Sequence, residues 1–279
     1  MILTKSFTIF VARVRRGFGI RMEPRKKALK VGQMLGLSRS QDGIRKPGLP
    51  DGFRIYAISD IHGCADLLQK MFTVIDKDLA TIGSRRAIHV FLGDYIDRGP
   101  ESRQTIDLLI DRGRKHESVF LKGNHEAFLF DVLKDPSQLQ HWKKFGGLQT
   151  LTSYGLRPSL NPDAEEQSEL IGQLAQAISP YQRRFFNNLK LRFVCGDFFF
   201  VHAGVKPGVA LSMQQEQDLL WIREEFLTSE ERFAKYIVHG HTPVREPDIR
   251  FNRINIDTGA FATGNLTLLT IQGDCLLAL

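Results

Sequence analysis

The sequence predicts an α/β fold in which two packed mixed β-sheets are flanked by helices. From residue 54 to residue 126, short apolar runs alternate with helical patterns in the order strand, helix, strand, helix, strand. This alternation is typical of a parallel sheet whose faces are covered by helices. After residue 188 the apolar runs follow one another closely, which indicates a further group of strands and therefore a second sheet.

The elements of the first half can be placed one by one. A short apolar run predicts a strand at residues 55–59, and apolar residues at helical spacing predict a helix over 66–79. Residues 87–94 predict a second buried strand, and residues 101–113 predict a second amphipathic helix. A third strand is predicted at 118–126, and it ends in polar residues.

The second half is predicted to begin with a mainly helical and polar region, residues 127–188. A hairpin over 189–205 then turns at Gly196, where Gly-Asp separates two apolar runs. Further strands are predicted at 235–243, 253–261 and 265–279. The sequence shows no internal repeat and no low-complexity tract, so we assign these elements to one α/β domain.

Composition excludes several classes of protein. The chain has 279 residues, of which 42% are hydrophobic and 25% are charged, as expected for a soluble globular protein. It has no run of about 18 apolar residues, so we expect no transmembrane helix. Its three cysteines are odd in number and widely spaced, which favours free thiols in a reducing compartment. We therefore expect a cytoplasmic protein, and we expect it to be a monomer.

The net charge of +7 is unevenly distributed along the chain. Residues 1–50 contain twelve Lys and Arg against two acidic residues, which gives a net charge of +10. Residues 51–279 contain 26 Lys and Arg against 29 Asp and Glu, which gives −3. We therefore divide the chain into a basic N-terminal extension, residues 1–50, and a nearly neutral folded domain, residues 51–279. No stable nucleic-acid partner is expected for the domain itself.

Three interpretations of the extension stay open. It is a disordered or partly helical tail, or an upstream translation overcall with the true start at Met22 or Met34, or a segment that contacts an anionic membrane or nucleic acid. The disordered tail is the simplest of the three. The apolar run at residues 7–11 is too short for a signal peptide.

Polar side chains follow each of the first three predicted strands. They are Asp60 and His62 in SDIHG, Asp94, Asp97 and Arg98 in GDYIDRG, and Asn124 and His125 in GNHE. The carboxyl ends of parallel strands converge on one crevice, so these groups are expected to meet there. Burying them without partners would cost about 1–3 kcal/mol per unsatisfied group. A pair of divalent metal ions would remove this cost, and carboxylate, imidazole and amide oxygen together suit Mn²⁺, Fe²⁺, Co²⁺ or Zn²⁺.

Three later histidines extend this pattern: His202 in VHAG, and His239 and His241 in VHGHTP. In this order, D-x-H-G, G-D-x-x-D-R-G, G-N-H-E, H-A-G and G-H-T resemble the motifs of the calcineurin-like metallophosphoesterase superfamily, over residues 54–270. GDYIDRG and GNHE are closest to its phosphoprotein phosphatase branch. Within that branch, HAG, WIR and HGHTP are similar to bacterial and phage serine/threonine phosphatases and symmetrical diadenosine-tetraphosphate hydrolases. The resemblance implies a metallophosphoesterase-type fold.

The resemblance also implies two divalent metal ions. The implied ligands are Asp60, His62 and Asp94 for the first ion, and Asp94, Asn124, His202 and His241 for the second. A carboxylate shared by both ions fits their usual separation of about 3.5–4 Å. The implied nucleophile is a hydroxide that bridges the ions. Mn²⁺ is the expected metal, with Fe, Co, Zn and Ni as alternatives.

Further residues receive catalytic and binding roles from the same resemblance. His125 would protonate the leaving oxygen, and Asp97 would orient that histidine and favour its charged form. Arg98, Arg223 and Asn124 would bind the phosphate, since the planar donors of arginine match phosphoryl oxygens well. No phosphoenzyme is expected, because nothing in the motif set requires a Cys or Asp nucleophile.

Residues beside the motifs are interpreted differently. The resemblance matches His241 to a family ligand, and His239 is expected to pack or to support a ligand. Trp221 is interpreted as a core residue rather than a substrate platform. Ser59 stands where glycine is usual, and we find no counterpart to the phosphate-contacting tyrosine near the C-terminus of eukaryotic members. These departures favour a compact bacterial form without regulatory subunits.

The predicted reaction is phosphoester hydrolysis, and two classes of phosphorylated substrate fit it. The first is a phosphomonoester, including phosphoserine and phosphothreonine in proteins. The alternative is a dinucleoside tetraphosphate cleaved symmetrically, with removal of nucleoside-polyphosphate caps from RNA 5′ ends. Both reactions are in-line attacks on phosphorus, so the metal motifs do not separate them. An adenine-sized aromatic slot would favour the alternative, and a broad shallow cleft would favour the phosphomonoester.

Overall fold

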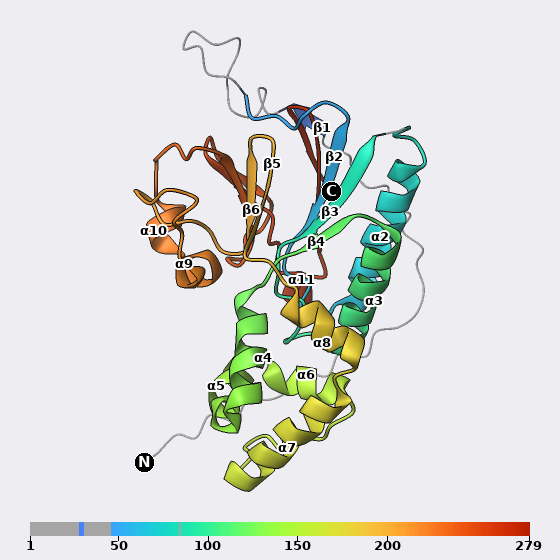
Figure 1. The fold of residues 1–279 in the computed structure, drawn as a ribbon, viewed down its shortest axis with the longest axis vertical. Coiled ribbons are helices and arrows are strands. Elements are labelled where there is room, and N and C mark those ends of the chain that lie inside the picture. The colour runs from blue at the N-terminus through green and yellow to red at the C-terminus, as the bar shows by residue number, and fades with distance from the viewer. Residues whose placement is uncertain (1–27, 31–45, 84) are drawn as a thin grey trace, which may run out of the picture.

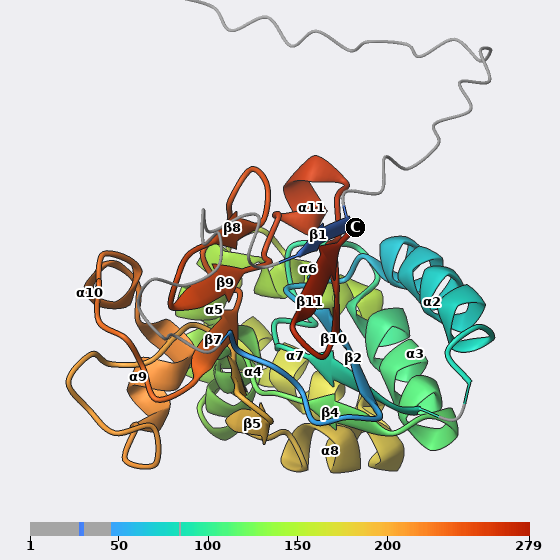
Figure 2. The same cartoon turned by 90° about the horizontal axis from the view of Figure 1, so that it is seen from above.

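Two β-sheets stack face to face, and helices cover the outer face of each sheet (Figure 1). The structure is a computed structural model, and it describes residues 28–30, 46–83 and 85–279. Figure 2 shows the same layers from above, with α2 and α3 on one side and α9 and α10 on the other. The predicted fold class, α/β with two mixed sheets flanked by helices, is confirmed.

The first sheet has six strands in the order β1-β11-β10-β2-β3-β4. Their bounds are β1 Ala28–Lys30, β2 Phe53–Ile58, β3 Arg86–Phe91, β4 Ser118–Phe120, β10 Leu268–Gln272 and β11 Cys275–Ala278. β2, β3 and β4 are parallel to one another, as the alternation of strands and helices predicts. β10 pairs antiparallel with both β2 and β11, so the sheet is mixed.

The second sheet has five strands in the order β5-β6-β7-β9-β8. Their bounds are β5 Arg192–Cys195, β6 Phe198–Val201, β7 Tyr236–His239, β8 Asp248–Ile249 and β9 Arg253–Asn255. β5 and β6 form the predicted hairpin, with Gly196 in its turn at a φ of 56°. β6, β7 and β9 run parallel, so their carboxyl ends lie at the same edge.

Helices occupy three positions around the sheets (Figure 1). Those on the outer face of the first sheet are α2 Ala65–Leu79 and α3 Ser102–Lys115. Those below the sheets are α4 Asn124–Lys134, η1 Pro136–Gln138, α5 Leu139–Trp142, η2 Lys143–Phe145, α6 Gly147–Ser153, α7 Ala164–Ala177 and α8 Pro180–Asn187. Those on the outer side of the second sheet are α9 Glu216–Trp221 and α10 Glu224–Leu227 (Figure 2). The short helix α11, Ala260–Thr263, lies apart from these three groups (Figure 2). The mainly helical region predicted at 127–188 is therefore confirmed.

Four predicted strands are shorter than the sequence suggested, among them those over 87–94 and 235–243, which end at Phe91 and His239. The single strand predicted over 265–279 is wrong as well, because that segment forms two strands, β10 and β11, on either side of Gly273.

The prediction over 118–126 is wrong beyond Phe120, because Asn124 begins α4 and the Glu126 carboxylate accepts the Gly123 amide at 2.9 Å to cap it. The prediction over 253–261 is wrong beyond Asn255, since Gly259 adopts a left-handed conformation that starts α11. Both differences place polar residues in turns or helices beyond the strand ends.

Alternation of side chains divides the core into layers. Ile55 and Ala57 of β2 lie between the two sheets, whereas Tyr56 and Ile58 face the helices. Likewise, alternate residues of β6 face opposite layers, and Phe200 lies between the sheets. An apolar run such as FFFV therefore has to be buried on both faces.

Carboxyl ends of strands from both sheets meet at one place. The amide of His241, beyond β7 in the second sheet, donates to both oxygens of Asp60, beyond β2 in the first, at 3.1 Å. The imidazole Nδ1 of His202, beyond β6, lies 2.9 Å from the carbonyl oxygen of Leu92, which follows β3. Packing of the two sheets thus brings together motifs that are up to 181 residues apart.

Part of the predicted N-terminal extension is described. β1 pairs antiparallel with β11, and Leu49 is buried between the sheets. The predicted disorder of the extension concerns residues 1–27 and 31–45, which lie outside the described residues. The boundary between extension and folded domain at residue 50 stays a prediction. Within the described part of the chain, no helix is long and apolar enough to cross a membrane.

Packing between the sheets predicts a large effect of truncation at Phe200, whose side chain is fully buried. Phe200→Ala should lower the free energy of unfolding by about 3–5 kcal/mol, because it removes apolar contacts and leaves a cavity. Urea denaturation measures this change. The matched control is Phe251→Ala, since Phe251 is 40% exposed and should change stability little. Equal effects of the two substitutions would contradict the layered core.

Candidate metal centre

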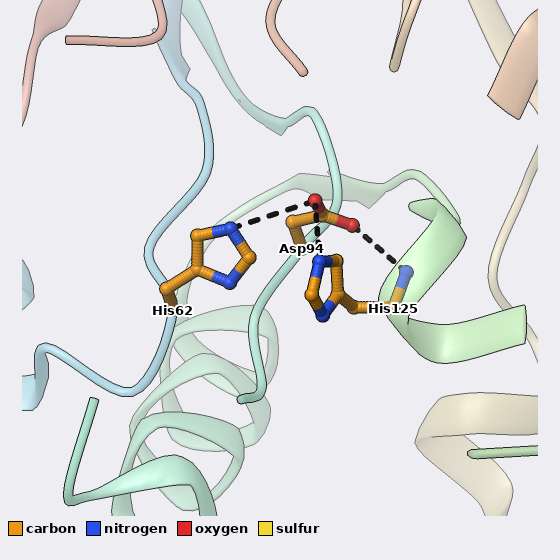
Figure 3. Close-up of side chains that lie close together, drawn as sticks. All are labelled: His62, Asp94 and His125. Atoms are coloured by element: carbon orange, nitrogen blue, oxygen red, sulfur yellow. Dashed lines mark hydrogen bonds and ion pairs between the residues drawn. The ribbon is translucent and has the colours of Figure 1, made fainter. Parts of the chain in front are cut away.

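Asp94 lies at the centre of a buried group of histidines (Figure 3). Its Oδ2 atom is 3.6 Å from Nε2 of His62 and 3.8 Å from Nε2 of His125, while its Oδ1 atom is 3.4 Å from Nε2 of His202. Two sets of side chains, each compact enough to hold one metal ion, share this carboxylate: His62, Asp94 and His125, and Asp94, His202 and His241. One carboxylate therefore belongs to two candidate ion sites.

Backbone carbonyl groups orient two of these histidines. Nδ1 of His62 lies 2.9 Å from the Ile96 carbonyl oxygen, and Nδ1 of His202 lies 2.9 Å from the Leu92 carbonyl oxygen. A neutral imidazole that donates from Nδ1 presents the lone pair of Nε2, which is the form that binds metals. Burial lowers the pKa of His62 well below its usual value and that of His202 to about 3, so both rings are neutral.

Asn124 and His241 complete the second set. Oδ1 of Asn124 lies 2.9 Å from Nε2 of His202, and Nδ1 of His241 lies 3.1 Å from the same nitrogen. Burial also lowers the pKa of His241, so this ring is neutral as well. The Nε2 atom of His241 is buried and has no hydrogen-bond partner among the described residues. The four predicted ligands of the second ion, Asp94 included, are therefore brought together.

Asp60 lies beside this group, although it belongs to neither compact set. Its carboxylate accepts a hydrogen bond from the Ser59 hydroxyl and from the His241 amide. Burial and the neighbouring Asp257 raise its pKa well above the usual value. A Cβ atom on Gly240 would overlap both the Ser59 hydroxyl and the Asp60 carboxylate, so only glycine fits there. The structure puts His125, rather than Asp60, in the set with His62, and the predicted assignment of Asp60 as a ligand stays a prediction.

The residues present fit a pair of divalent cations. Burial raises the pKa of Asp94 above its usual value, and the nearby charge of Asp60 raises it further, so these carboxylates repel each other without a counter-ion. Neutral imidazoles cannot supply the missing positive charge. Carboxylate oxygens, imidazole nitrogens and an amide oxygen form the donor set that first-row divalent metals bind. The side chains are thus placed to bind divalent metal ions.

Backbone conformation at the centre is strained. Among the described residues, five non-glycine residues have a positive φ: His62, Asp94, Asp97, Arg98 and His241. All five are predicted site residues, and such conformations cost of order 1–3 kcal/mol each. Strain confined to one centre indicates that the fold holds these side chains for function.

His125 is held from its far side by a buried carboxylate. Its Nδ1 atom lies 2.7 Å from Oδ2 of Asp97, and the same oxygen accepts the indole N–H of Trp142 at 2.6 Å. Thr150 donates to the other oxygen at 2.5 Å. Burial raises the pKa of Asp97 to about 7, although the hydrogen bonds from Thr150 and Trp142 oppose the rise. Nε2 of His125 consequently faces Asp94, 3.8 Å from its Oδ2 atom.

Both predicted phosphate-binding arginines lie at the rim. Nη2 of Arg98 is 3.2 Å from Nε2 of His125, and its guanidinium group lies 4.9 Å from the ring centroid of Phe261. Arg223 is exposed, and its Nη1 atom donates to the Thr242 hydroxyl at 3.0 Å. The positive charges of both arginines contribute to the lowered pKa of His125, behind the larger effect of burial.

Sequence reasoning missed several residues that shape the centre. The Glu126 carboxylate accepts the backbone amides of Asp94 at 2.9 Å and Tyr95 at 2.8 Å, which fixes the loop that carries Asp94. Glu126 stands inside the quoted GNHE motif, so a signal for it existed. The ring centroid of Phe261 lies 5.5 Å from that of His62, and the Phe261 side chain is 41% exposed. No sequence pattern pointed to this residue. His239, in contrast, packs its buried ring 4.9 Å from that of Phe226.

The fold and this centre define an α/β protein whose side chains are placed to bind divalent metal ions. The family model described as calcineurin-like phosphoesterase matches residues 53–265, so the chain belongs to this family. The resemblance seen in the motifs is therefore confirmed, and the chain is a phosphatase of the metallophosphoesterase type.

Individual relatives carry two kinds of name. The chain is 31% identical over 230 residues to the asymmetrical bis(5′-nucleosyl)-tetraphosphatase PrpE of Bacillus velezensis, covering 75% of this chain and 86% of that protein. It is 30% identical over 223 residues to serine/threonine-protein phosphatase 1 of Salmonella typhimurium, covering 78% and 92%. A crystal structure provisionally described as a diadenosine tetraphosphatase shares the fold, with a TM-score of 0.57, 21% identity and coverage of 83% and 95%.

Removal of the Asp94 charge should empty both ion sites. Asp94→Asn is expected to abolish turnover and metal loading together, because the two sets of side chains share this carboxylate. Metal content by atomic emission and phosphatase rate measure the two effects. Asp111→Asn, an exposed carboxylate on α3, is the control and should change neither. A near-wild-type rate for Asp94→Asn would contradict the shared role.

Substitution of His125 tests whether this residue acts as a proton donor or as a metal ligand. His125→Asn is expected to lower turnover by about 10²–10⁴-fold, the usual contribution of a proton donor, while metal content stays nearly full. His116→Asn, at a histidine whose ring lies 5.0 Å from that of His89 and which belongs to neither candidate ion site, is the control. Loss of metal from His125→Asn would instead make His125 a ligand, as its place in the set with His62 and Asp94 allows.

Proposed function

We propose that the chain hydrolyses phosphomonoesters, phosphoserine and phosphothreonine of proteins included. The observation that supports this most strongly is the position of Asp94, whose carboxylate is shared by two sets of potential ligands and lies 3.8 Å from His125. Two arginines border the same centre. A phosphoryl group bound there would meet a proton donor and positive charges at once.

The proposed ligands are those implied by the motifs, and Asp94 is proposed to belong to both ion sites. They are Asp60, His62 and Asp94 for one ion and Asp94, Asn124, His202 and His241 for the other. When bound, the two ions supply Lewis-acid stabilisation of phosphoryl charge and an acidified water as nucleophile. We propose Mn²⁺ as the metal, since carboxylate, imidazole and amide donors suit it, with Fe, Co, Zn and Ni as alternatives.

The protein groups have separate roles in this reaction. Nε2 of His125 donates a proton to the leaving oxygen, and Asp97 holds Nδ1 and stabilises the positive ring while it carries that proton. Arg98 and Arg223 pair with phosphoryl oxygens, where developing negative charge strengthens the contacts, and Asn124 also contacts the phosphate. Glu126 keeps the Asp94 loop in place.

A second candidate function is hydrolysis of a dinucleoside tetraphosphate, with removal of nucleoside-polyphosphate caps from RNA as an extension. A cavity with aromatic walls beside the centre favours it. The sequence favoured symmetrical cleavage, whereas the Bacillus velezensis relative is named asymmetrical. The mode of cleavage is directly observable, because symmetrical cleavage gives two molecules of ADP and asymmetrical cleavage gives ATP and AMP.

We also propose that the protein is a cytoplasmic monomer. Cys64, Cys195 and Cys275 are all free, as expected in a reducing compartment. The basic N-terminal extension remains a candidate for contact with an anionic surface. Deletion of residues 1–50 tests that contact, since loss of binding to anionic vesicles or RNA at low salt is the expected result.

A substrate panel tests the proposed function. With Mn²⁺ added, the rates for a phosphoserine peptide, an aryl phosphate, diadenosine tetraphosphate and capped RNA are compared, and nucleotide products are identified by chromatography. The proposed function predicts the highest kcat/KM on phosphomonoesters. Higher kcat/KM on diadenosine tetraphosphate would replace it with the second candidate. Asp94→Asn protein serves as the blank, and equal rates with this blank would contradict hydrolysis at this centre.

A further inference from the structure

The segment from Trp142 to Thr150 packs against the loop that carries Asp97. It comprises the end of α5, the 3₁₀ helix η2 and the first part of α6, which lie below the sheets beside α4 (Figure 1). None of the motifs that predicted the metal centre includes a residue of this segment. Its side chains nevertheless reach the carboxylate that holds His125.

The Asp97 carboxylate is enclosed by three partners. Oδ2 accepts the indole N–H of Trp142 at 2.6 Å and lies 2.7 Å from Nδ1 of His125, while Oδ1 accepts the Thr150 hydroxyl at 2.5 Å. All four side chains are fully buried, so water cannot replace these contacts. Because an indole N–H can only donate, Oδ2 acts as an acceptor, and the proton of its contact with His125 lies on Nδ1. The ring is thereby fixed with Nε2 as the nitrogen that faces Asp94.

One hydroxyl holds both the backbone and the side chain of Asp97. Besides donating to Oδ1, the Oγ1 atom of Thr150 accepts the Asp97 amide at 2.9 Å. It also lies 3.1 Å from the Ser102 hydroxyl, whose oxygen accepts the same amide at 3.0 Å. A threonine hydroxyl has one donor and two acceptor sites, so its whole capacity is used here. These contacts hold Asp97 in its strained conformation, at a φ of 72°.

Two adjacent glycines let the segment come this close to the loop. Gly146 has a φ of 99°, and a Cβ atom on it would overlap the backbone of Arg98. A Cβ atom on Gly147 would overlap the indole ring of Trp142. The Gly146 carbonyl oxygen accepts the Arg98 amide at 3.3 Å. The glycine pair therefore serves the fit between this segment and residues 97–98.

We propose that Trp142 and Thr150 are positioning residues for proton donation, because they hold the Asp97 carboxylate so that it fixes the ring of His125. The inference rests on the proposed hydrolysis, in which His125 is the proton donor. As the P–O bond breaks, its electron pair goes to the leaving oxygen, which takes the proton from Nε2. The ring becomes neutral and keeps its other proton on Nδ1, donated to Asp97. A purely structural role of Trp142 and Thr150 would stabilise the fold without affecting this transfer.

Leaving groups of different basicity separate proton donation from folding. p-Nitrophenolate is a weak base that departs without a proton, whereas phenolate, of similar size, depends on one. Thr150→Val removes the hydroxyl, and Trp142→Phe removes the N–H but keeps an aromatic ring. Each should lower the ratio of kcat/KM for phenyl phosphate to that for p-nitrophenyl phosphate about tenfold, a usual loss for a positioning contact. A ratio measured on one protein sample cancels any loss of folded or metal-loaded protein.

Matched variants sharpen this test. Thr105→Val is the control, because Thr105 is also fully buried and its hydroxyl has no hydrogen-bond partner among the described residues, so the ratio should stay unchanged. Thr150→Ser keeps the hydroxyl and should retain the wild-type ratio. Thr150→Val added to His125→Asn should lower the ratio no further, since both act through one proton. An unchanged ratio in Thr150→Val and Trp142→Phe, an equal fall in Thr105→Val, or an additive fall in the double variant would overturn the proposal.

A measurement that needs no turnover tests the same contact. In Zn²⁺-loaded protein, the Nδ1 proton of His125 should give an NMR signal far downfield of the backbone amides, identified by its absence from His125→Asn. Thr150→Val should move or broaden this signal, whereas Thr105→Val should leave it in place. Absence of the signal from the wild type, or an unchanged signal in Thr150→Val, would overturn the positioning role. Turnover of neither ester above the Asp94→Asn blank would instead overturn the hydrolysis, and the NMR signal would still decide the positioning.

Discussion

The shared Asp94 carboxylate is the constraint on which the rest of the structure depends. It must lie between histidines from both sheets, and a buried negative charge beside Asp60 is tolerable only with cations nearby. Its backbone adopts a φ of 53°, and the Glu126 carboxylate holds its amide at 2.9 Å. The strain and the buried polar contacts are thus concentrated at the candidate metal centre, while the apolar layers around it supply stability.

The two-sheet architecture explains why the predicted ligands converge. Parallel strands of each sheet end at the same edge, and the apolar layer between the sheets aligns the two edges. Hydrogen bonds from the His241 amide to Asp60 and from His202 to the Leu92 carbonyl cross from one sheet to the other. The centre therefore depends on sheet packing. Helix α4 carries His125 of the centre, and it also carries Phe128 and Phe130, which line a cavity.

Sequence patterns predicted most of the strands and the two flanked sheets, because strand alternation is a local signal. The position of polar residues after apolar runs likewise indicated that Asp60, Asp94 and Asn124 would lie near one another, whereas their roles as ligands came from the family resemblance. The sequence did not predict the contact of Trp142 with Asp97, since it joins residues 45 positions apart through an irregular helical region. It likewise could not show the cavity, whose lining residues lie in three stretches of the chain, 122–141, 186–191 and 216–221. The strand ends at Phe120 and Asn255 were missed because turn and capping contacts, rather than hydrophobicity, decide them.

The most direct test is to locate the ions themselves. Crystals of the protein grown with Mn²⁺ would be measured at a wavelength where manganese scatters anomalously. The account predicts two anomalous peaks per chain on either side of the Asp94 carboxylate, one next to His62 and the other next to His202 and His241. A single peak, or two peaks that do not share Asp94, would contradict it.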